Sequence, residues 1–290
     1  MTWPDDLTVC GMRASIVVSF LAALICANGF AQGQQDKQAG RGTNVRLAPV
    51  RQMREDVDLW PLILHPNNAA ERRINAMLTH LNENLTNKIN DCLSGEFAWS
   101  KASFSGGEWQ RTVKVTMTGP RFLSMVAGDG FYCGTAHPDD DMTVVVFDME
   151  TGELVDWKTL LAKTAGASSP QILLPYEGGA IPLILPELQV IYASAEEAYC
   201  KDNFEDERPF FLWPDAESGT LIAEVAGLPH AALPCKNELK LTIEQARKLG
   251  FDEGLLQAID EAHRIAAASS KAKPERKQSA PTAATRPDSH

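Results

Sequence analysis

A short apolar run near the N-terminus constrains this chain more than any other feature. Residues 16–27 are apolar apart from Ser19. Crossing a bilayer core takes about 20 residues, so this run is too short to span one, but it suits the hydrophobic segment of a signal peptide. Gly29 and Ala31 supply small residues at the −3 and −1 positions of a cleavage site. We therefore expect residues 1–31 to be a signal peptide, and the mature chain to be periplasmic or secreted, without a transmembrane helix.

The same segment allows other interpretations. Asp5 and Asp6 carry the wrong charge to precede an export signal, which favours Met12 over Met1 as the start of translation. The run could instead be a buried core helix. It could also belong to a lipoprotein processed at Cys26, although Ile25 is bulky for that processing site.

Export determines how the remaining cysteines are interpreted. Removal of residues 1–31 leaves Cys92, Cys133, Cys200 and Cys235. Cysteines of exported proteins commonly form disulfides, and four of them allow three connectivities. We favour Cys92–Cys133 and Cys200–Cys235, because each bridge then closes a local loop. A zinc site is the weaker alternative, since the chain has no C-x-x-C pair.

Composition separates the two ends of the chain from its body. Residues 32–57 have few large apolar side chains and predict a flexible N-terminal arm, and residues 269–290 predict a disordered basic tail with a net charge of +3. Residues 58–268 form the predicted folded domain. The whole chain is 44% hydrophobic and has a net charge of −11. This acidity argues against nucleic acid as a partner, because phosphate binding requires clustered Lys and Arg.

Periodicity predicts helices around a block of antiparallel strands. Asn68 and Glu71 resemble a capping box that begins a helix at residues 69–91. Its expected core stripe is Ile74, Met77, Leu78, Leu81, Leu85 and Ile89. Period-2 alternation predicts strands at residues 113–117, 121–127, 143–147, 219–225 and 239–243. Shorter helices are expected at residues 157–163, where Asp156 would be the cap, and at residues 195–204. Two more are expected to begin after Thr242 and after Asp252. The predicted fold class is α+β, with helices packed on an antiparallel sheet and with disulfide bonds.

Few residues form a pattern that carries chemistry. The chain lacks a nucleophile elbow, an H-E-x-x-H zinc motif and a phosphate-binding loop, so we assign no catalytic residue, no metal and no cofactor. Gly128-Asp129-Gly130 is interpreted as a turn between strands. The tryptophans could stack on sugars, although packing in a core is their commoner role.

One local cluster is the best candidate for a binding site. It consists of His137, Asp139, Asp140 and Asp141. Imidazole and carboxylate groups could together hold a ligand or a metal ion. Consecutive Asp residues after a proline more often solvate a turn, and that is the interpretation we favour.

Three segments make the chain similar to a known family. They are Phe131–Pro138 (FYCGTAHP), Val146–Leu154 (VFDMETGEL) and Trp157–Leu161 (WKTLL). They resemble an extracytoplasmic domain of unknown function, found in the C-terminal half of RsiV-type (lysozyme-sensing) anti-sigma factors and beside some peptidoglycan deacetylase domains. The matching positions are Gly134, His137, Pro138, Asp148, Thr151 and Gly152. The resemblance covers roughly residues 70–250, and Cys133 departs from it by replacing a glycine.

The resemblance implies an α+β domain that recognises envelope components, and it brings no catalytic residues. RsiV-type anti-sigma factors have a cytoplasmic segment and a membrane helix where this chain has an expected cleavable signal. This difference argues against anti-sigma activity. We therefore expect an exported bacterial envelope protein that acts as a non-catalytic binding or sensing module for a protein or a cell-wall ligand. The alternatives are a periplasmic hydrolase acting on peptidoglycan or another glycan, and a structural partner in an envelope complex.

Overall fold

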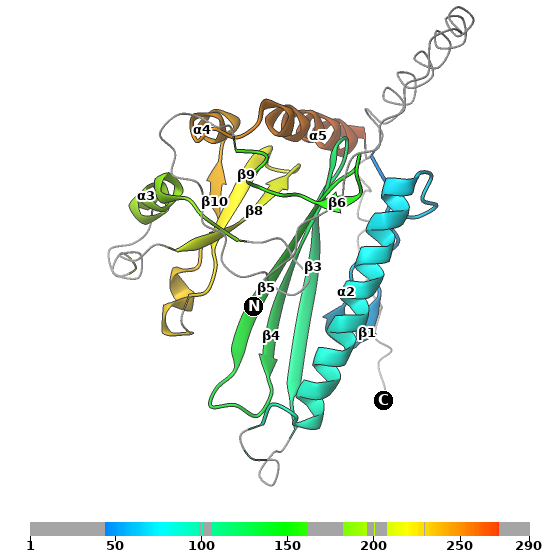
Figure 1. Cartoon of the computed structure of the whole chain (residues 1–290), viewed down its shortest axis with the longest axis vertical. Coiled ribbons are helices and arrows are strands. Elements are labelled where there is room, and N and C mark those ends of the chain that lie inside the picture. Colours follow the sequence, from blue (N-terminus) through cyan, green and yellow to red (C-terminus); the bar gives the residue numbers. More distant parts are fainter. Residues whose placement is uncertain are drawn as a thin grey trace, which may run out of the picture. The chain divides into compact units, whose positions relative to one another are not determined.

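A computed structural model describes residues 44–98, 100, 106–161, 182–195, 200, 208–228 and 230–272. The predicted signal peptide and the predicted tail beyond residue 272 lie outside these ranges. Within them, no helix is both long enough and apolar enough to cross a membrane. The fold is α+β, as predicted: two sheets built mainly of antiparallel strands, with helices packed against them (Figure 1).

The first sheet is built around a meander of three long strands. These are β3 (Glu108–Thr118), β4 (Phe122–Tyr132) and β5 (Asp139–Asp148), paired antiparallel. The short strands β1 (Gln52–Arg54) and β2 (Val57–Asp58) extend the sheet beyond β3, and β6 (Glu153–Leu154) pairs with the end of β5. The strands expected at residues 113–117, 121–127 and 143–147 are therefore present, and each is longer than its alternating pattern indicates.

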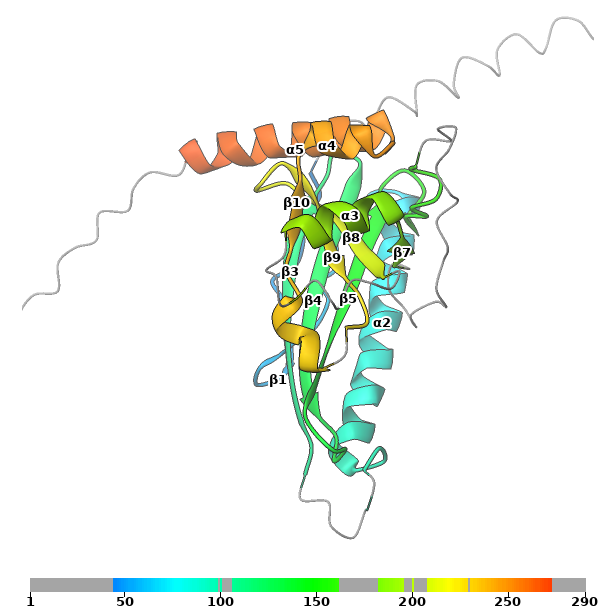
Figure 2. The ribbon, with the colours of Figure 1, turned by 90° about the vertical axis from the view of Figure 1, so that its left-hand side faces the viewer.

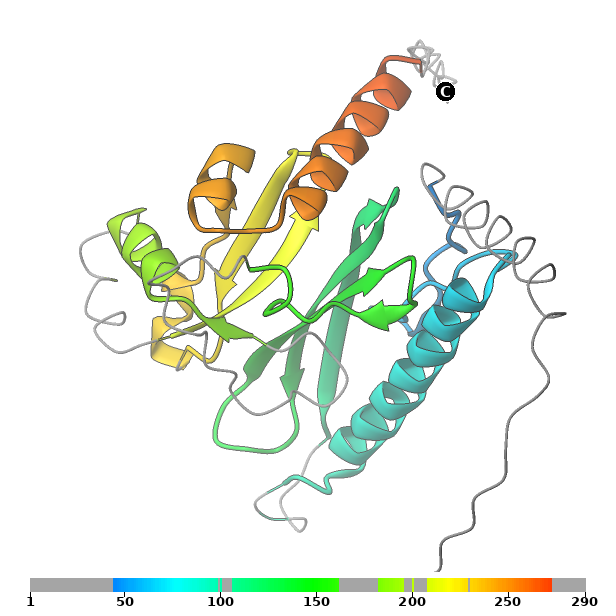
Figure 3. The same cartoon turned by 45° about the horizontal axis from the view of Figure 1, so that its top comes forward.

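A long amphipathic helix, α2 (Ala69–Ser94), lies on one face of this sheet (Figure 3). The predicted cap is confirmed, since the Asn68 side chain accepts a hydrogen bond from the backbone N–H of Glu71 at 2.8 Å. The Glu71 carboxylate accepts from the N–H of Asn67 at 2.6 Å, one residue earlier than in a standard capping box. Met77 was predicted to belong to the core stripe, and this prediction is wrong, because its side chain is 39% exposed. It lies to one side of the buried stripe of Ile74, Leu78 and Leu81.

The second sheet packs against the other face of the meander (Figure 2). Its strands are β7 (Leu183–Ile184), β8 (Pro209–Asp215), β9 (Thr220–Val225) and β10 (Leu239–Leu241), in the order β10-β9-β8-β7. Buried side chains of both sheets, such as Val144 of β5 and Trp213 of β8, meet in one core. Around this sheet lie α3 (Pro186–Ala195), a 3-10 helix (His230–Cys235), α4 (Ile243–Lys248) and α5 (Glu253–Ala272).

Two helix starts agree with the sequence, and one predicted strand ends early. Thr242 and Gln245 form a capping box at the start of α4, and Asp252 accepts a hydrogen bond from the N–H of Leu255 at the start of α5. Because Thr242 caps α4, Ile243 is helical, and the strand predicted to reach residue 243 ends at Leu241.

Several other predicted elements differ from the structure. Residues 157–160 form turns and not a helix, although Asp156 does accept from the N–H of Lys158. Most of the helix expected at residues 195–204 lies outside the described residues, and α3, which was not predicted, ends at Ala195. Helix α5 continues to Ala272, so the first residues of the predicted tail are helical.

Residues 44–57, the described part of the arm predicted as flexible, are ordered. Their backbone bonds to the sheet: the N–H of Val45 donates to the carbonyl of Thr118 at 2.9 Å, and Leu47 forms a β-bridge with Ile63. Val57 is buried. Backbone hydrogen bonds need no apolar side chains, which explains why composition missed this segment.

Both favoured disulfides are present. Cys92 and Cys133 join the C-terminal turn of α2 to the segment between β4 and β5, with their Cα atoms 4.7 Å apart. Cys200 and Cys235 are joined with their Cα atoms 5.5 Å apart. The first bridge ties the helix to the sheet at the end where the candidate site lies.

Candidate functional site

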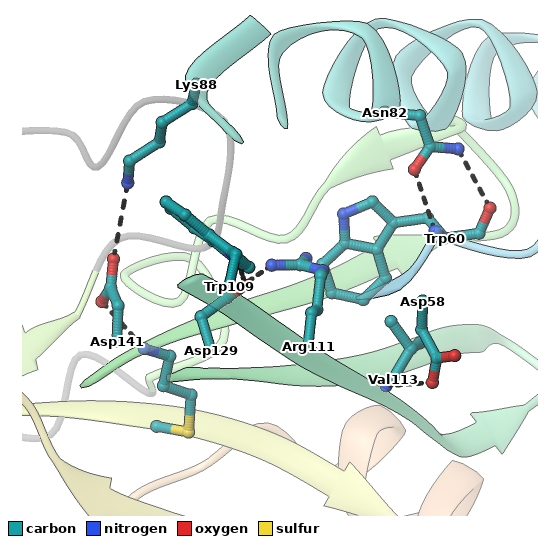
Figure 4. A network of polar contacts seen from close by, with 10 residues as sticks. Asp58, Trp60, Asn82, Lys88, Trp109, Arg111, Val113, Asp129 and Asp141 are labelled. Atoms are coloured by element: carbon teal, nitrogen blue, oxygen red, sulfur yellow. Dashed lines mark hydrogen bonds and ion pairs between the residues drawn. The ribbon is translucent and has the colours of Figure 1, made fainter. Parts of the chain in front are cut away.

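A row of charged residues crosses the face of the first sheet that is covered by α2. Arg111 of β3 lies directly opposite Asp129 of β4, which lies directly opposite Asp141 of β5. Side chains alternate along a strand, so these three project from the same face as the buried apolar residues Val113 and Ala127. The row therefore places charges at positions where the alternating pattern of β3 and β4 is otherwise apolar. Figure 4 shows Arg111, Asp129 and Asp141 in this row.

Arg111 and Asp129 form a buried ion pair. Nη1 of Arg111 donates to Oδ2 of Asp129, and the two side chains are 3% and 4% exposed. The indole Nε1 of Trp109 donates to Oδ1 of the same carboxylate at 2.8 Å. The guanidinium carbon of Arg111 lies 4.9 Å from the centre of the Trp60 ring. Both oxygens of Asp129 therefore have partners, whereas the buried Nε of Arg111 has no hydrogen-bond partner among the described residues.

Asp141 and Lys88 lie at the outer end of the row. Nζ of Lys88, from α2, is 4.0 Å from Oδ2 of Asp141 and 5.5 Å from the centre of the Trp109 ring. Burial raises the pKa of Asp141, and the negative charge of Asp129 adds to this rise; the N–H of Met142 and the nearby lysines act in the opposite direction. Asp141 thus keeps a proton more readily than an ordinary aspartate does.

Asparagines of α2 hold the segment that carries Trp60. The Asn82 side chain accepts from the N–H of Trp60 at 2.9 Å and donates to its carbonyl at 3.1 Å (Figure 4). Asn75 makes the same pair of bonds to Ile63, at 2.8 and 2.9 Å. Each amide satisfies one donor and one acceptor of the backbone, so the chain between β2 and α2 is fixed along the helix.

These elements enclose a groove between α2 and β5. Its volume is about 880 Å³. One wall is the flank of α2, with His80, Asn84 and Lys88, and the other wall includes Thr143 of β5 and Phe211 of β8. Trp60, Trp109, Arg111 and Asp129 line its inner part. The groove combines fixed polar groups with apolar surface, as small-ligand and peptide sites usually do.

The structure does not bring the predicted cluster of His137 and the three aspartates into one site. Residues 139–141 are the start of β5 and not part of a loop, so successive side chains point to opposite faces. Asp139 and Asp141 project toward the α2 side. Asp140 projects toward the second sheet, where Lys236 binds it at 3.4 Å and also binds Glu224 at 3.3 Å. His137 lies in an exposed turn with its Nδ1 2.8 Å from the carbonyl of Pro138.

No group of three or more metal-ligating side chains occurs in the part of the chain that the structure describes. Two aspartates of the run instead bond to the backbone of their own strand. Asp139 accepts from the N–H of Asp140 at 3.0 Å, and Asp141 accepts from the N–H of Met142 at 2.8 Å.

Sequence reasoning missed most of the groove. Gly128-Asp129-Gly130, interpreted as a turn, lies inside β4, where Asp129 pairs with β3 and β5. A signal was present: Arg111 and Asp129 each occupy the apolar register of an alternating segment. Two opposite charges in the buried register of neighbouring strands indicate a buried pair, which can be recognised only once the strands are aligned.

No family model matches the chain, and no curated protein matches it. Two solved structures are similar to parts of it, both described as DUF3298 family proteins. One, from Pseudomonas aeruginosa PAO1, has a TM-score of 0.36 and 12% sequence identity. The match covers 54% of this chain and 67% of that protein's chain. The other, from Bacteroides fragilis, has a TM-score of 0.44 and 9% identity and covers 70% of this chain and 86% of its own. At these TM-scores the likeness assigns neither a family nor a ligand.

Proposed function

We propose that this chain is a non-catalytic binding module of the bacterial cell envelope, and that its ligand lies in the groove between α2 and β5. The observation that carries the proposal is the groove itself. Its volume of about 880 Å³ lies within the range typical of ligand sites, and buried contacts hold its inner wall. Arg111, Asp129 and Trp109 are bonded to one another, and Asn82 fixes Trp60. Side chains held in this way can recognise a ligand without rearranging.

Export is part of the same proposal. Two disulfides in one domain are typical of proteins that mature in an oxidising compartment, and the apolar run at residues 16–27 fits a signal peptide. The periplasm or the cell exterior is therefore the location we propose.

A hydrolase acting on a cell-wall glycan is the second candidate. One observation favours it: Asp141 has a raised pKa and faces the groove, as a general acid would. Glycosidases usually need a second carboxylate as base or nucleophile. The nearest on the sheet, Asp129, is buried and already bonded to Arg111 and Trp109. Because Asp129 is already bonded to these two residues, we place binding ahead of hydrolysis.

A capture experiment tests the proposal. The exported full chain is immobilised and exposed to envelope extract, in parallel with Thr143→Trp, which fills the groove, and Thr79→Trp, which adds the same bulk at an exposed position of α2. We expect one ligand to be retained by the wild type and by Thr79→Trp and to be lost from Thr143→Trp. Equal retention by all three proteins, each melting as the wild type does, would overturn the groove as the site.

The hydrolase candidate has its own measurement. Purified peptidoglycan is incubated with the full chain, and newly formed reducing ends are counted. The binding proposal predicts none above a blank. If the wild type forms reducing ends and Asp141→Asn does not, the chain is a hydrolase and the binding proposal is wrong.

A further inference from the structure

The outer edge of β5 presents backbone groups to the groove. The carbonyls of Val146 and Asp148 accept from Val155 and Gly152 at 2.8 and 2.7 Å, so the peptide groups of these two residues face away from β4. Along an antiparallel strand, residues alternate between bonding one neighbouring strand and the other. The β4–β5 register is unbroken from Asp148 to Asp139. The peptide groups of Val144, Met142 and Asp140 therefore face the same outer edge.

This edge and α2 are the two long walls of one groove. On the helix side the groove runs from His80 to Asp91, about 16 Å at the usual rise per residue. On the sheet side it follows β5 from Asp141 to Val144. A length of about 16 Å accommodates about five residues of extended chain. Among the described residues, only β6 pairs with this edge, at Phe147 and Asp148, so the part of β5 before them has an open edge there. A sheet edge of this kind is where extended peptides bind by adding a strand.

We propose that the groove binds an extended, basic peptide segment of a partner protein, which adds to the outer edge of β5 as a further strand. This inference rests on the proposed function and specifies its ligand class. Val144, at one end of this row of outward-facing peptide groups, supplies a backbone donor and an acceptor for the new pairing.

Charge favours a basic segment. The groove is lined by Asp91, Asp129 and Asp141 against Lys88 and Arg111, which leaves one negative charge, and the whole chain carries −11. Asp139 and Asp141 also occupy the N–H groups of Asp140 and Met142. Charged side chains of this kind protect an edge from unspecific pairing. A basic peptide pairs with these carboxylates as it releases the two amides, so the same residues protect the empty edge and select the partner.

The two tryptophans that line the groove argue against a sugar stacked on them as the occupant. Trp109 is stacked on Phe131 with ring centres 4.7 Å apart and has Lys88 5.5 Å from its ring centre. The guanidinium of Arg111 occupies a face of Trp60. Sugar rings bind by stacking on open aromatic faces, and these two tryptophans already use theirs for packing.

The test begins by selecting random linear twelve-residue peptides, displayed on phage, on the full chain. The selected peptides are then synthesised with one backbone amide methylated at a time. Strand addition predicts enrichment in Lys and Arg. It also predicts that methylation weakens binding about tenfold at alternate positions and less than about twofold at the positions between, because only alternate amides bond to β5. Binding is expected to be lost in Thr143→Trp and kept in Thr79→Trp.

The remaining outcomes each contradict a different statement. If methylation weakens binding at consecutive amides as much as at alternate ones, strand addition is wrong. If the selected peptides are enriched in acidic residues, the basic segment is wrong. Failure to enrich any peptide on the wild type relative to Thr143→Trp would overturn the peptide ligand. Loss of a muropeptide or chitin-oligomer ligand from Thr143→Trp, with no peptide selected, would keep the groove as the binding site while overturning the ligand class. If no tested ligand distinguishes the wild type from Thr143→Trp, the proposed function itself is contradicted.

Discussion

Arg111 and Asp129 face each other across β3 and β4 as an ion pair that is almost completely buried, and Trp109 donates to the same carboxylate. The pair lies at the base of the groove between α2 and β5. A buried pair of this kind contributes little net stability compared with apolar residues, but each charge requires the other.

Removal of one partner should therefore be costly. Asp129→Ala leaves the Arg111 charge buried without its carboxylate, and we expect the free energy of unfolding to fall by about 3–5 kcal/mol. The double variant Arg111→Met, Asp129→Leu should lose much less, because no charge then stays buried. Urea unfolding of the three proteins measures both effects. Equal losses for the single and the double variant would show that packing, and not charge, dominates here.

Gly152 should tolerate no side chain. Its φ is +76°, and a Cβ atom there would lie 2.4 Å from the carbonyl oxygen of Ala70, the second residue of α2. We expect Gly152→Ala to cost about 2–5 kcal/mol, the sum of backbone strain and overlap. Gly227 is the matched control, with a φ of +68° and no atom within 4 Å of the added Cβ. Gly227→Ala should cost only the strain, about 1–2 kcal/mol. Thermal unfolding that shows equal costs would contradict the close approach to α2.

Each disulfide should contribute through the loop that it closes. The separations are 41 residues for Cys92–Cys133 and 35 for Cys200–Cys235, and loop closure predicts about 4 kcal/mol for each. Because the dependence on length is logarithmic, replacing either pair by serines should cost nearly the same. Peptide mapping of the exported protein without reductant should recover these two pairs. A different pairing, or free thiols, would refute both the connectivity and the compartment.

Asp215 and Asp141 should respond to pH in opposite ways. Burial opposes ionisation of Asp215, but bonds from the backbone and hydroxyl of Ser218, together with Lys114, outweigh it and lower its pKa. Its charge therefore stabilises the fold above the ordinary pKa of 3.8, and this stabilisation is lost as the pH falls through the lowered value. Asp215→Asn should melt below the wild type at pH 7, and the difference should shrink at pH 3.

Asp141 has the opposite sign, because its pKa is raised above 3.8. Its ionised form weakens the fold at pH 7, and this effect disappears as protonation proceeds on lowering the pH. Asp141→Asn keeps an oxygen for the N–H of Met142 and should melt at or above the wild-type temperature at pH 7. Melting curves at pH 7 and pH 3 test both variants. A marked loss of stability in Asp141→Asn at pH 7 would show that its charge is needed where it lies.

Local sequence patterns predicted the features that depend on neighbours along the chain. Asn68, Thr242 and Asp252 begin helices because their side chains reach backbone N–H groups three residues ahead. The α+β class follows from helical and alternating periods, and the disulfides join cysteines that are near one another in sequence. These interactions span a few residues to about forty, so a pattern read along the chain contains them.

The candidate site depends on packing between segments that are distant in the sequence. Whether Asp129 meets Arg111 depends on the register between two strands, and the same alignment places Gly128 and Gly130 inside β4 instead of at a turn. Asp139, Asp140 and Asp141 are consecutive, yet the alternation of β5 directs them to two different faces. The groove needs α2 beside an edge of β5 more than forty residues away in sequence, and packing of the whole domain determines that position. Local interactions select helices and strands, whereas the register and the docking of those elements depend on the free energy of the complete core.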